Sequence, residues 1–599
     1  MEDRLNLVGP NSFFTFIFFA FDVNNEYERN TMSEQLTKMT AADALVIMLD
    51  KMGVKHIFGV CGDTSLPFYD SLVKLDHDIT HILTRDERCA AYMADVYARL
   101  TNRVGVVEGP SGAGATYMVP GIAEANGTTI PVLAITSDIP VAGRDRFVLT
   151  ECDQEALFKT FTKYTRVAEI PEAVPTAVRA AFNAMTSGTP GAAHIGLPYD
   201  VLKGEVDASE VWVDPSFNSF PCRRTLPSSE DLQAAVTLLQ ESKKIAIVCG
   251  GGVMHSGAVE ELIELCETLG SPVGTTISAK GTITETHPLA MGTIGTNGST
   301  AGARDVLREA DTLVYIGCRV GSVTSEKRTN PYNGEKKILH IDIDPKSIGA
   351  NYLTDVSLVG DAKATIAELL TTLKKAQAKT FSQNWGIEAV RVSKVQKKER
   401  FDRYSQSDDM PIYGERFVTE LQKSLPDDAI VVSDPGTPTP FLCAFFETQQ
   451  SGRSFIFHRF HGGLGFALPG VVGAHFANTG RKIVGIMGDG SFGFSSGELE
   501  TIVRYNLPVT LIVLNNSSFG WIRAGQDRSF GKRYFSTKFS TTDHAKIASA
   551  YGLKTWSVKD PNLLAATLKE AFETEGPTLV DVYTRPLEES EVPVTAFLG

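Results

Sequence analysis

The chain has 599 residues and a formal net charge of −14, from 57 lysine and arginine residues against 71 aspartate and glutamate residues, which argues against nucleic-acid binding. Hydrophobic residues make up 43% of the chain, as in ordinary globular proteins, and its length exceeds the roughly 250 to 300 residues that one core supports, so we expect three domains. The eight cysteines are scattered without a Cys-x-x-Cys pair, which argues against a disulfide framework or a structural zinc site.

The first 38 residues are predicted to form an N-terminal extension, disordered and outside the fold. Their apolar run at residues 13–21 is shorter than the roughly 20 residues of a membrane helix. The acidic residues Glu2 and Asp3 precede this run, whereas a signal peptide has a basic leader. We therefore expect a cytoplasmic protein that does not contact a membrane, with organelle targeting by residues 1–38 left open.

From residue 39 onward, short apolar strands alternate with amphipathic helices, a pattern typical of parallel sheets covered by helices. We predict a first domain over 39–206, a polar linker over 207–229 and a second domain over 230–375. A second connection, partly helical, follows over 376–409, and a third domain occupies 410–599. The predicted fold is α/β, with three tandem parallel-sheet domains. Strands are predicted at 56–60, 104–108, 131–137, 192–198, 245–249, 313–317, 338–344, 429–434, 482–489, 509–516 and 578–584.

The third domain contains the polar residues best placed for chemistry. One predicted strand ends in Gly-Asp-Gly at 488–490, a helix is predicted to begin at Ser495, and the next strand ends in Asn-Asn at 515–516. Adjacent parallel strands bring both clusters to the edge where α/β sheets bind ligands. The oxygens of Asp489 and Asn516 suit a magnesium ion that carries phosphate oxygens. The pair of motifs predicts a metal and diphosphate site, although either motif alone is more often a turn or a helix cap.

The spacing of these motifs resembles the signature of thiamine diphosphate enzymes. The chain from about Thr40 onward resembles the superfamily of acetolactate synthases, pyruvate decarboxylases and oxalyl-CoA decarboxylases, notably at 59–72, 84–100 and 108–116. The resemblance implies that Glu87 is the catalytic glutamate. Its carboxylate would bond N1′ of the aminopyrimidine and so promote internal removal of the thiazolium C2 proton. Without the resemblance, a glutamate at a predicted helix start is more often a favourable N-terminal charge.

Two segments of the third domain resemble further cofactor-binding segments of this superfamily. In HGGLGFALPG at 461–470, Leu464 would be the apolar wedge that bends the cofactor, and the Gly462 carbonyl would accept from its 4′-amino group. The alternative is a tight loop before a helix. SDPGTP at 433–438 resembles the diphosphate loop. The implied contacts are Gly436, Thr437, Gly462, Leu464, Gly488, Gly490 and Ser491 for the cofactor, and Asp489, Asn516 and Ser518 for magnesium.

The resemblance also suggests a reaction. In this superfamily a 2-oxo acid loses carbon dioxide on the cofactor, and the resulting enamine is protonated or attacks a second carbonyl compound. SGAGAT at 111–116 lacks the histidine pair of pyruvate decarboxylases and resembles the synthases, which favours acetolactate synthase-like carboligation of a 2-oxo acid such as pyruvate. A 2-oxo acid or oxalyl-CoA-type decarboxylase, a 2-hydroxyacyl lyase, and a catalytically inactive interaction protein remain alternatives. The candidate substrate residues are Thr150, Lys163, His461, Trp521 and Gly525, of which Thr150, Trp521 and Gly525 depart from the synthase pattern.

The middle domain resembles the FAD-binding domain of the synthases, or the nucleotide-binding domain of their coenzyme A-using relatives. Arg319 and Asp342 would contact FAD, ADP or coenzyme A, and an unliganded Rossmann-like scaffold is the alternative. The Gly-Gly-Gly at 250–252 lacks the remaining spacing of an NAD-binding fingerprint. In this superfamily the catalytic glutamate and the metal site belong to different subunits, which implies a homodimer or homotetramer with its active sites between subunits.

Overall fold

The computed structural model describes residues 37–590, except 297, 378–380 and 382–383. The apolar run at 13–21 lies outside the described residues, as does nearly all of the predicted extension. Lys38, the last residue of that extension, belongs to β1 (Lys38–Thr40), which pairs antiparallel with β8 (Glu205–Asp207). No helix in the described part of the chain is long and apolar enough to cross a membrane.

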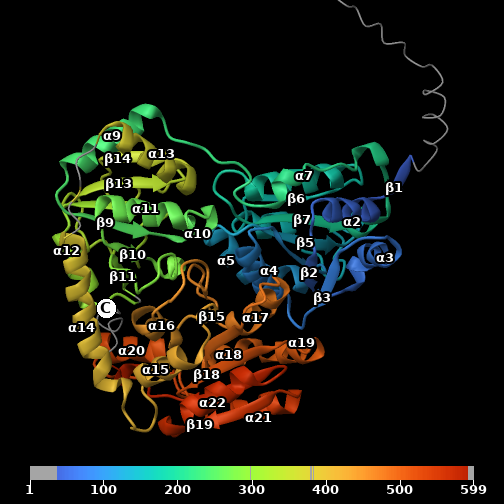
Figure 1. The fold of residues 1–599 in the computed structure, drawn as a ribbon. Helices are drawn as coiled ribbons and strands as arrows, with labels where there is room; N and C mark the ends of the chain where they lie inside the picture. The colour runs from blue at the N-terminus through green and yellow to red at the C-terminus, as the bar shows by residue number, and fades with distance from the viewer. Residues whose placement is uncertain (1–36, 297, 378–380, 382–383, 591–599) are drawn as a thin grey trace, which may run out of the picture.

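The described chain contains three six-stranded parallel sheets covered by helices, which confirms the predicted α/β fold (Figure 1). The first sheet has the order β3-β2-β4-β5-β7-β6. Its strands are β2 (His56–Gly59), β3 (Thr80–Leu83), β4 (Gly105–Gly109), β5 (Val132–Asp138), β6 (Tyr164–Val167) and β7 (Ala193–Pro198). The helices are α2 (Ala41–Lys51), α3 (Leu66–Lys74), α4 (Glu87–Thr101), α5 (Ala113–Gly127), α6 (Gln154–Lys159), α7 (Ala173–Thr186) and α8 (Tyr199–Lys203).

The middle sheet has the order β11-β10-β9-β12-β13-β14, which is 3-2-1-4-5-6 when its strands are counted along the chain. This is the strand order of dinucleotide-binding Rossmann folds. Its strands are β9 (Ile245–Cys249), β10 (Val273–Thr275), β11 (Ala290–Thr293), β12 (Thr312–Ile316), β13 (Lys337–Asp342) and β14 (Val356–Val359). The helices are α9 (Ser229–Glu241), α10 (Gly251–Ser256), α11 (Val259–Leu269), α12 (Ala301–Glu309) and α13 (Ala362–Lys375).

The third sheet has the order β16-β15-β17-β18-β20-β19. Its strands are β15 (Ile430–Ser433), β16 (Phe455–Phe457), β17 (Ile483–Gly488), β18 (Val509–Asn515), β19 (Lys554–Val558) and β20 (Thr578–Tyr583). The helices are α15 (Gly414–Ser424), α16 (Pro438–Phe445), α17 (Ala467–Phe476), α18 (Asp489–Ser495), α19 (Leu499–Arg504), α20 (Gly520–Ser529), α21 (His544–Tyr551) and α22 (Pro561–Glu573). The predicted helix start at Ser495 is wrong, because α18 begins at Asp489, directly after β17.

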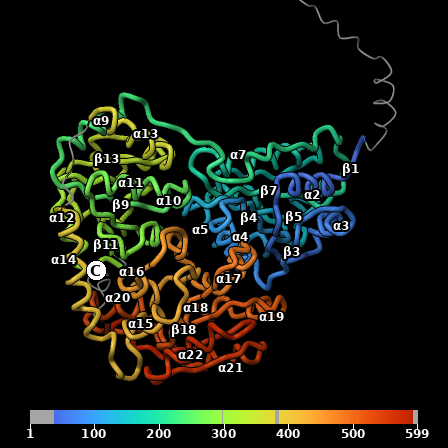
Figure 2. Tube along the Cα trace, in the orientation of Figure 1, coloured from blue at the N-terminus to red at the C-terminus, as the bar shows by residue number. Residues whose placement is uncertain are grey.

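Two connections join the three domains (Figure 2). The first contains short 3-10 turns at Ala208–Glu210 and Pro215–Asn218 before it reaches α9. The second contains α14 (Asn384–Ser405), a 22-residue helix that contacts α12 of the middle domain and α15 of the third. The prediction that this second connection is partly helical is confirmed.

The first and third domains meet where α4 packs against α17 (Figure 1). A Cβ atom on Gly473 of α17 would lie 2.1 Å from the backbone oxygen of Met93 in α4, so glycine is required for this close approach. At the start of α4, Arg88 donates a hydrogen bond to a backbone oxygen of α18, and the Arg85 amide donates to Glu498 at 2.9 Å. These contacts attach the start of α4 to the third domain of the same chain.

Candidate functional site

Four polar side chains come together where β15, β17 and β18 end. Asn516 donates through Nδ2 to Thr437 Oγ1 at 3.4 Å, and its Oδ1 accepts from the Ser518 hydroxyl at 3.0 Å. The Asp489 carboxylate accepts from the backbone amides of Asn516, at 3.0 Å, and Ser517. The strand order of this sheet reverses between β15 and β17, and such a switch point is where open α/β sheets bind ligands. The predicted metal residues therefore lie together, beside the predicted cofactor residue Thr437.

Asp489 is the only carboxylate among the predicted metal ligands, and it is 5% exposed. Burial raises the pKa of its carboxyl to about 6, although backbone amides donate hydrogen bonds to it. Within the described residues no group of three or more His, Cys, Asp or Glu side chains could hold a metal ion. Magnesium commonly uses one or two carboxylates and completes its shell with water and phosphate oxygens. This donor set fits a magnesium diphosphate better than a metal held by protein ligands alone.

Two glycines leave the backbone at this edge open to a ligand. Gly436 has a φ of +102°, and a Cβ atom on Gly436 or Gly488 would meet no heavy atom within 4 Å. A Cβ atom on Gly490 would instead lie 2.8 Å from the ring of Phe519. Ser491 is buried in α18, two residues after Asp489. The space over Gly436 and Gly488 would let a phosphate group approach the main chain closely.

Glu87, the predicted catalytic residue, is the first residue of α4 and is 7% exposed. Glycines make room for its side chain, because a Cβ atom on Gly114 would lie 2.9 Å from Glu87 Oε1 and one on Gly109 would lie 3.2 Å from Cγ. Burial raises the pKa of Glu87, and the negative charges of Asp86 and Glu108 raise it further. Such a carboxyl is suited to sharing a proton with a ring nitrogen.

Glu108 is a second buried carboxylate near Glu87 that the sequence analysis missed. It lies on β4 and is 1% exposed. One of its oxygens accepts a hydrogen bond from the Tyr69 hydroxyl at 2.7 Å, and Tyr69 also lies 2.9 Å from Nε2 of His81. The other oxygen has no hydrogen-bond partner among the described residues. The available signal was a charged residue inside a predicted buried strand.

Two of the candidate substrate residues lie in the first domain. Thr150 is exposed, has a φ of +71°, which is unusual for a β-branched residue, and exchanges a hydrogen bond with Ser111 at 2.7 Å. It therefore lies beside the predicted Ser-Gly-Ala-Gly-Ala-Thr segment. The Lys163 ammonium group donates to three backbone carbonyls within residues 184–189, and burial lowers its pKa. Its three hydrogens are thus already engaged by the first domain.

The other candidates are in the third domain. Trp521 and Gly525 are both on α20, where Trp521 packs against the hydrophobic core and Gly525 has open space around its Cα. His461 is exposed, and its backbone amide donates to Glu124 at 2.7 Å. In the same loop Gly462 has a φ of +77° and Leu464 is half-buried. Gly462 and Leu464 thus lie in a loop whose conformation requires glycine.

A cavity of about 1080 Å³ lies between the first and middle domains. It reaches the ends of β9 and β12, where the middle sheet changes strand order. Arg319 and Asp342, the two predicted nucleotide contacts, both line it. Burial raises the pKa of Asp342 to about 6, and Arg319 donates to the backbone of Gly127 and lies over the ring of Phe460 at 5.3 Å. The cavity size and the fold around it suit a dinucleotide.

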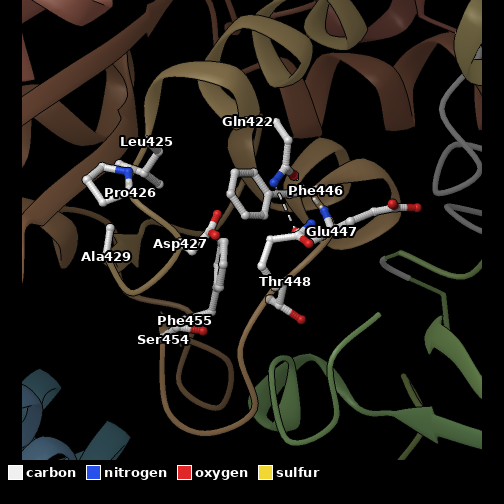
Figure 3. A pocket seen from close by; sticks show the side chains of 11 residues that line it. Gln422, Leu425, Pro426, Asp427, Ala429, Phe446, Glu447, Thr448, Ser454 and Phe455 are labelled. Atoms are coloured by element: carbon white, nitrogen blue, oxygen red, sulfur yellow. Dashed lines mark hydrogen bonds between the residues drawn. The ribbon is translucent and has the colours of Figure 1, made fainter. Parts of the chain in front are cut away.

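A separate hollow in the third domain is too small for a cofactor (Figure 3). It lies between the end of α15 and the segment after α16, where Gln422 and Glu447 exchange hydrogen bonds of 2.8 and 3.0 Å. Its volume is about 10 Å³, which is room for about one water molecule. We therefore do not count it as a functional site.

Comparisons with known proteins agree with this geometry. Three family models match the chain: the N-terminal TPP binding domain of thiamine pyrophosphate enzymes over residues 39–157, their central domain over 232–369, and their C-terminal TPP binding domain over 434–582. A probable acetolactate synthase large subunit of Methanocaldococcus jannaschii is 37% identical, with 92% of this chain and 93% of the relative covered. An acetolactate synthase of Arthrospira platensis is 31% identical, with 92% and 95% covered, and an acetolactate synthase large subunit of Corynebacterium glutamicum is 33% identical, with 84% and 79% covered.

Proposed function

Because this chain belongs to the thiamine pyrophosphate enzyme family and is an enzyme of that family, we propose that it joins two carbonyl compounds, with a 2-oxo acid such as pyruvate as donor. Thiamine diphosphate would be its coenzyme and magnesium its metal. The relatives that carry the name acetolactate synthase cover almost the whole chain, which supports carboligation as the reaction.

One observation carries the assignment of the magnesium and diphosphate site: Asp489, Asn516, Ser518 and Thr437 converge at the switch point of the third sheet, next to open glycine backbone. Asp489, Asn516 and Ser518 would hold the metal. Thr437, Ser491 and the main chain at Gly436, Gly488 and Gly490 would contact the phosphates, because hydroxyls and close backbone amides bind phosphate oxygens well.

Thiamine diphosphate, when bound, would supply a nucleophilic carbon for reaction with the carbonyl group of the 2-oxo acid. The protein's part begins with Glu87, whose buried carboxyl would share a proton with N1′ of the aminopyrimidine ring. Because burial raises its pKa, Glu87 holds that proton more readily than an exposed glutamate does. Gly462 would accept from the 4′-amino group through its carbonyl, and Leu464 would keep the two rings folded toward each other.

The middle cavity is proposed to bind FAD in a structural role. Its volume of about 1080 Å³ lies above the roughly 300 to 1,000 Å³ of ordinary small-molecule pockets. ADP would leave much of this space empty, and coenzyme A remains the competing occupant. The test is to denature the purified protein and identify the released small molecules by absorbance and mass spectrometry. One equivalent of flavin per chain is expected, and adenine nucleotide without flavin would contradict the assignment.

We propose further that the active enzyme is a homodimer or homotetramer in which Glu87 of one subunit faces the metal site of another. Exposed apolar side chains support this, because several follow the strand ends of the first sheet, on the edge that carries Glu87. Among them are Phe147, which is 99% exposed, Leu149 at 86% and Leu66 at 57%. Such side chains on one edge indicate a protein interface. Light scattering is expected to give a mass of at least two chains.

A second candidate function is decarboxylation, or lyase cleavage of a 2-hydroxyacyl compound, without carboligation. It is favoured by Lys163, whose ammonium is bonded to backbone carbonyls and so is not free to bind the carboxylate of a second oxo acid. Purified protein supplied with the coenzyme, magnesium and pyruvate distinguishes the two. Carbon dioxide with acetolactate supports carboligation, whereas carbon dioxide alone supports the second candidate. No turnover with any 2-oxo acid or with oxalyl-CoA would contradict both and favour an interaction role.

A further inference from the structure

Two buried carboxylates hold the loop at residues 458–467, one at each end. At the far end, Asp434 is fully buried after β15 and accepts hydrogen bonds from three successive backbone amides. These are the amides of Gly465 at 3.0 Å, Phe466 at 2.9 Å and Ala467 at 2.9 Å. Asp434 thus fixes the start of α17 from within the third domain.

The near end of the loop is held by Glu124, which belongs to the first domain. Glu124 lies on α5, its side chain is fully buried, and it accepts from the amides of Arg459 at 2.9 Å, Phe460 at 2.9 Å and His461 at 2.7 Å. More than 330 residues separate these partners in the sequence. A carboxylate that binds three successive amides satisfies buried donors which would otherwise be left without partners.

His458 connects the two ends. Its Nδ1 lies 2.6 Å from the carbonyl oxygen of Gly463, and its Nε2 lies 2.8 Å from Glu124 Oε2. A carbonyl oxygen only accepts, so Nδ1 donates to Gly463, and the Nε2 edge of the ring faces the Glu124 carboxylate. The ring is packed between Tyr92 and Phe466, at centroid distances of 5.3 and 5.0 Å. His458 therefore has one defined orientation.

The charge environment supports an ionised Glu124. Although burial opposes ionisation, His458 and Arg99 lower the pKa of Glu124 to about 2. Arg99 Nη2 lies 3.8 Å from Glu124 Oε1 and is itself paired with Asp95. The backbone amide of Arg459 lowers it further. Glu124 thus remains a charged acceptor throughout the ordinary pH range.

Between the two carboxylates only residues 462–464 lack such an anchor on their backbone amides among the described contacts. Gly462, the first residue of this stretch, and Gly465, the residue that follows it, have φ values of +77° and +83°. A Cβ atom on Gly463 would lie 2.4 Å from the Tyr92 hydroxyl, so α4 limits the loop from the other side. The hydrogen bonds on both sides therefore restrict the backbone that carries Gly462 and Leu464.

We propose that Glu124 is a positioning residue for the coenzyme, acting across the domain junction through the loop at 458–467. The first domain would thereby set the shape of the coenzyme pocket in the third domain of the same chain. This inference rests on the proposed function, because it takes Gly462 and Leu464 as coenzyme contacts. The competing explanation is that Glu124 only stabilises the junction between the two domains.

The test compares Glu124→Gln with Asp43→Asn in the full-length protein. Asp43 is a buried carboxylate of α2 that accepts from Ser71 at 2.7 Å and pairs with Lys74 at 2.8 Å, outside the site. Hydrogen exchange of residues 458–467 is measured without coenzyme, and the dissociation constant of thiamine diphosphate is measured with magnesium present. Glu124→Gln is expected to speed exchange and to raise the dissociation constant about tenfold or more, because misplaced groups lose binding steeply. Asp43→Asn is expected to change neither.

Faster exchange in Glu124→Gln with an unchanged dissociation constant would overturn the proposal, since the loop would then be held without serving the coenzyme. Unchanged exchange would overturn it as well. If wild-type protein fails to bind thiamine diphosphate at all, the proposed function itself fails and this inference fails with it. Should Glu124→Gln not fold, Glu124→Asp keeps the charge but withdraws it by one methylene. The same two measurements on that variant then decide, with a smaller increase in the dissociation constant expected.

Discussion

The first and third domains have the same topology but different chemistry. Counted along the chain within each sheet, both have the strand order 2-1-3-4-6-5, and α4 and α17 occupy the same place in that order. These two equivalent helices are the ones that pack against each other at the domain junction (Figure 1). Yet α4 begins with the buried acid Glu87, whereas α17 follows the loop that carries Leu464.

The residues at the corresponding strand ends of the first and third sheets also differ. The third strand of the first sheet carries Glu108, while its counterpart in the third sheet leads into Asp489. The first carboxylate bonds Tyr69, whereas the second is held by backbone amides beside Asn516. In the proposed function, one topology presents a proton-transfer group in the first domain and a metal ligand in the third, because the side chains at the strand ends decide the chemistry. The proposed active site needs both edges.

The largest effect is expected when Glu87 is replaced in one chain and Asp489 in another. Glu87→Gln and Asp489→Ala should each lower kcat by roughly 100-fold or more, because each removes a group acting on the coenzyme. If each site combines Glu87 of one subunit with Asp489 of another, a mixed dimer of these variants contains one intact site. Refolding the two together at equal concentrations should then recover up to about a quarter of wild-type activity.

The control for that experiment is a chain carrying both substitutions, mixed with an equal amount of wild-type protein. In that mixed dimer every site between subunits lacks one group, so activity should come from the wild-type dimers alone. Failure of the two single variants to restore activity, with mixed dimers present by mass spectrometry, would mean that each chain forms its own site.

An intermediate effect is expected from adding a methyl group at the ligand-binding edge of the first sheet or of the third sheet. Gly114→Ala places a Cβ atom 2.5 Å from Pro110 Cδ and 2.9 Å from Glu87 Oε1, so it should displace the acid and lower kcat about tenfold with little change in coenzyme affinity. Gly488→Ala meets no protein atom within 4 Å, so it should leave the melting temperature unchanged but weaken coenzyme binding. Calorimetric titration and steady-state kinetics on both variants measure this contrast. Equal effects of the two on affinity would contradict it.

A smaller effect concerns stability against pH. The pKa of Glu124 is about 2 in the folded protein, below its ordinary value of 4.5. Its ionisation therefore stabilises the fold fully above pH about 4.5, and this contribution is lost as the pH falls toward 2. The difference in urea midpoint between wild type and Glu124→Gln should be largest at pH 7 and shrink as the solution is acidified below pH about 4.5. A difference that grows on acidification would show that the carboxylate is not ionised.

The smallest effect is expected from Glu108→Gln. Burial is the main reason that the pKa of Glu87 is raised, and Asp86 and Glu108 add negative charge. Removing the charge of Glu108 should therefore lower the pKa of Glu87, so the acidic limb of the activity profile should move to lower pH. The profile of kcat against pH measures this shift, with Asp43→Asn as the control. An unmoved acidic limb would mean that Glu108 does not influence the ionisation of Glu87.

Most inner strands were predictable from the sequence, whereas the edge strands and the three-residue inner strand β10 were not. The predicted strands at 245–249 and 509–516 match β9 and β18 closely, because strands buried on both faces form continuous apolar runs. The missed strands include β3, β6, β14 and β19, which are edge strands with exposed or half-buried positions. Partial exposure removes the apolar run on which the prediction depended. The missed start of α18 has another cause, since β17 ends at Gly488 and α18 begins at the next residue, Asp489, with no loop between them.

In the candidate site, residues within one supersecondary unit were predictable from the sequence, whereas contacts between distant segments were not. Asp489 and Asn516 were predictable because one strand-helix-strand unit contains both, and the parallel pairing of β17 with β18 brings the ends of those strands together. Glu124 and Asp434 were not, although both bind the loop that carries Leu464. No local pattern distinguishes a glutamate in the middle of α5 from an ordinary helical residue. Its role exists only after two domains have folded against each other.

By itself the sequence determined three α/β units, the motif that identifies a coenzyme family, and the residue types able to hold magnesium and a proton. These depend on periodicity and short spacing, which act within a single supersecondary unit. Only the tertiary structure decided that a large cavity lies beside the ends of β9 and β12, that Glu87 is buried beside a second carboxylate, and that Glu124 holds a loop of another domain. Burial and hydrogen bonding between distant segments arise from packing, because the same side chains are solvated and apart in the unfolded chain.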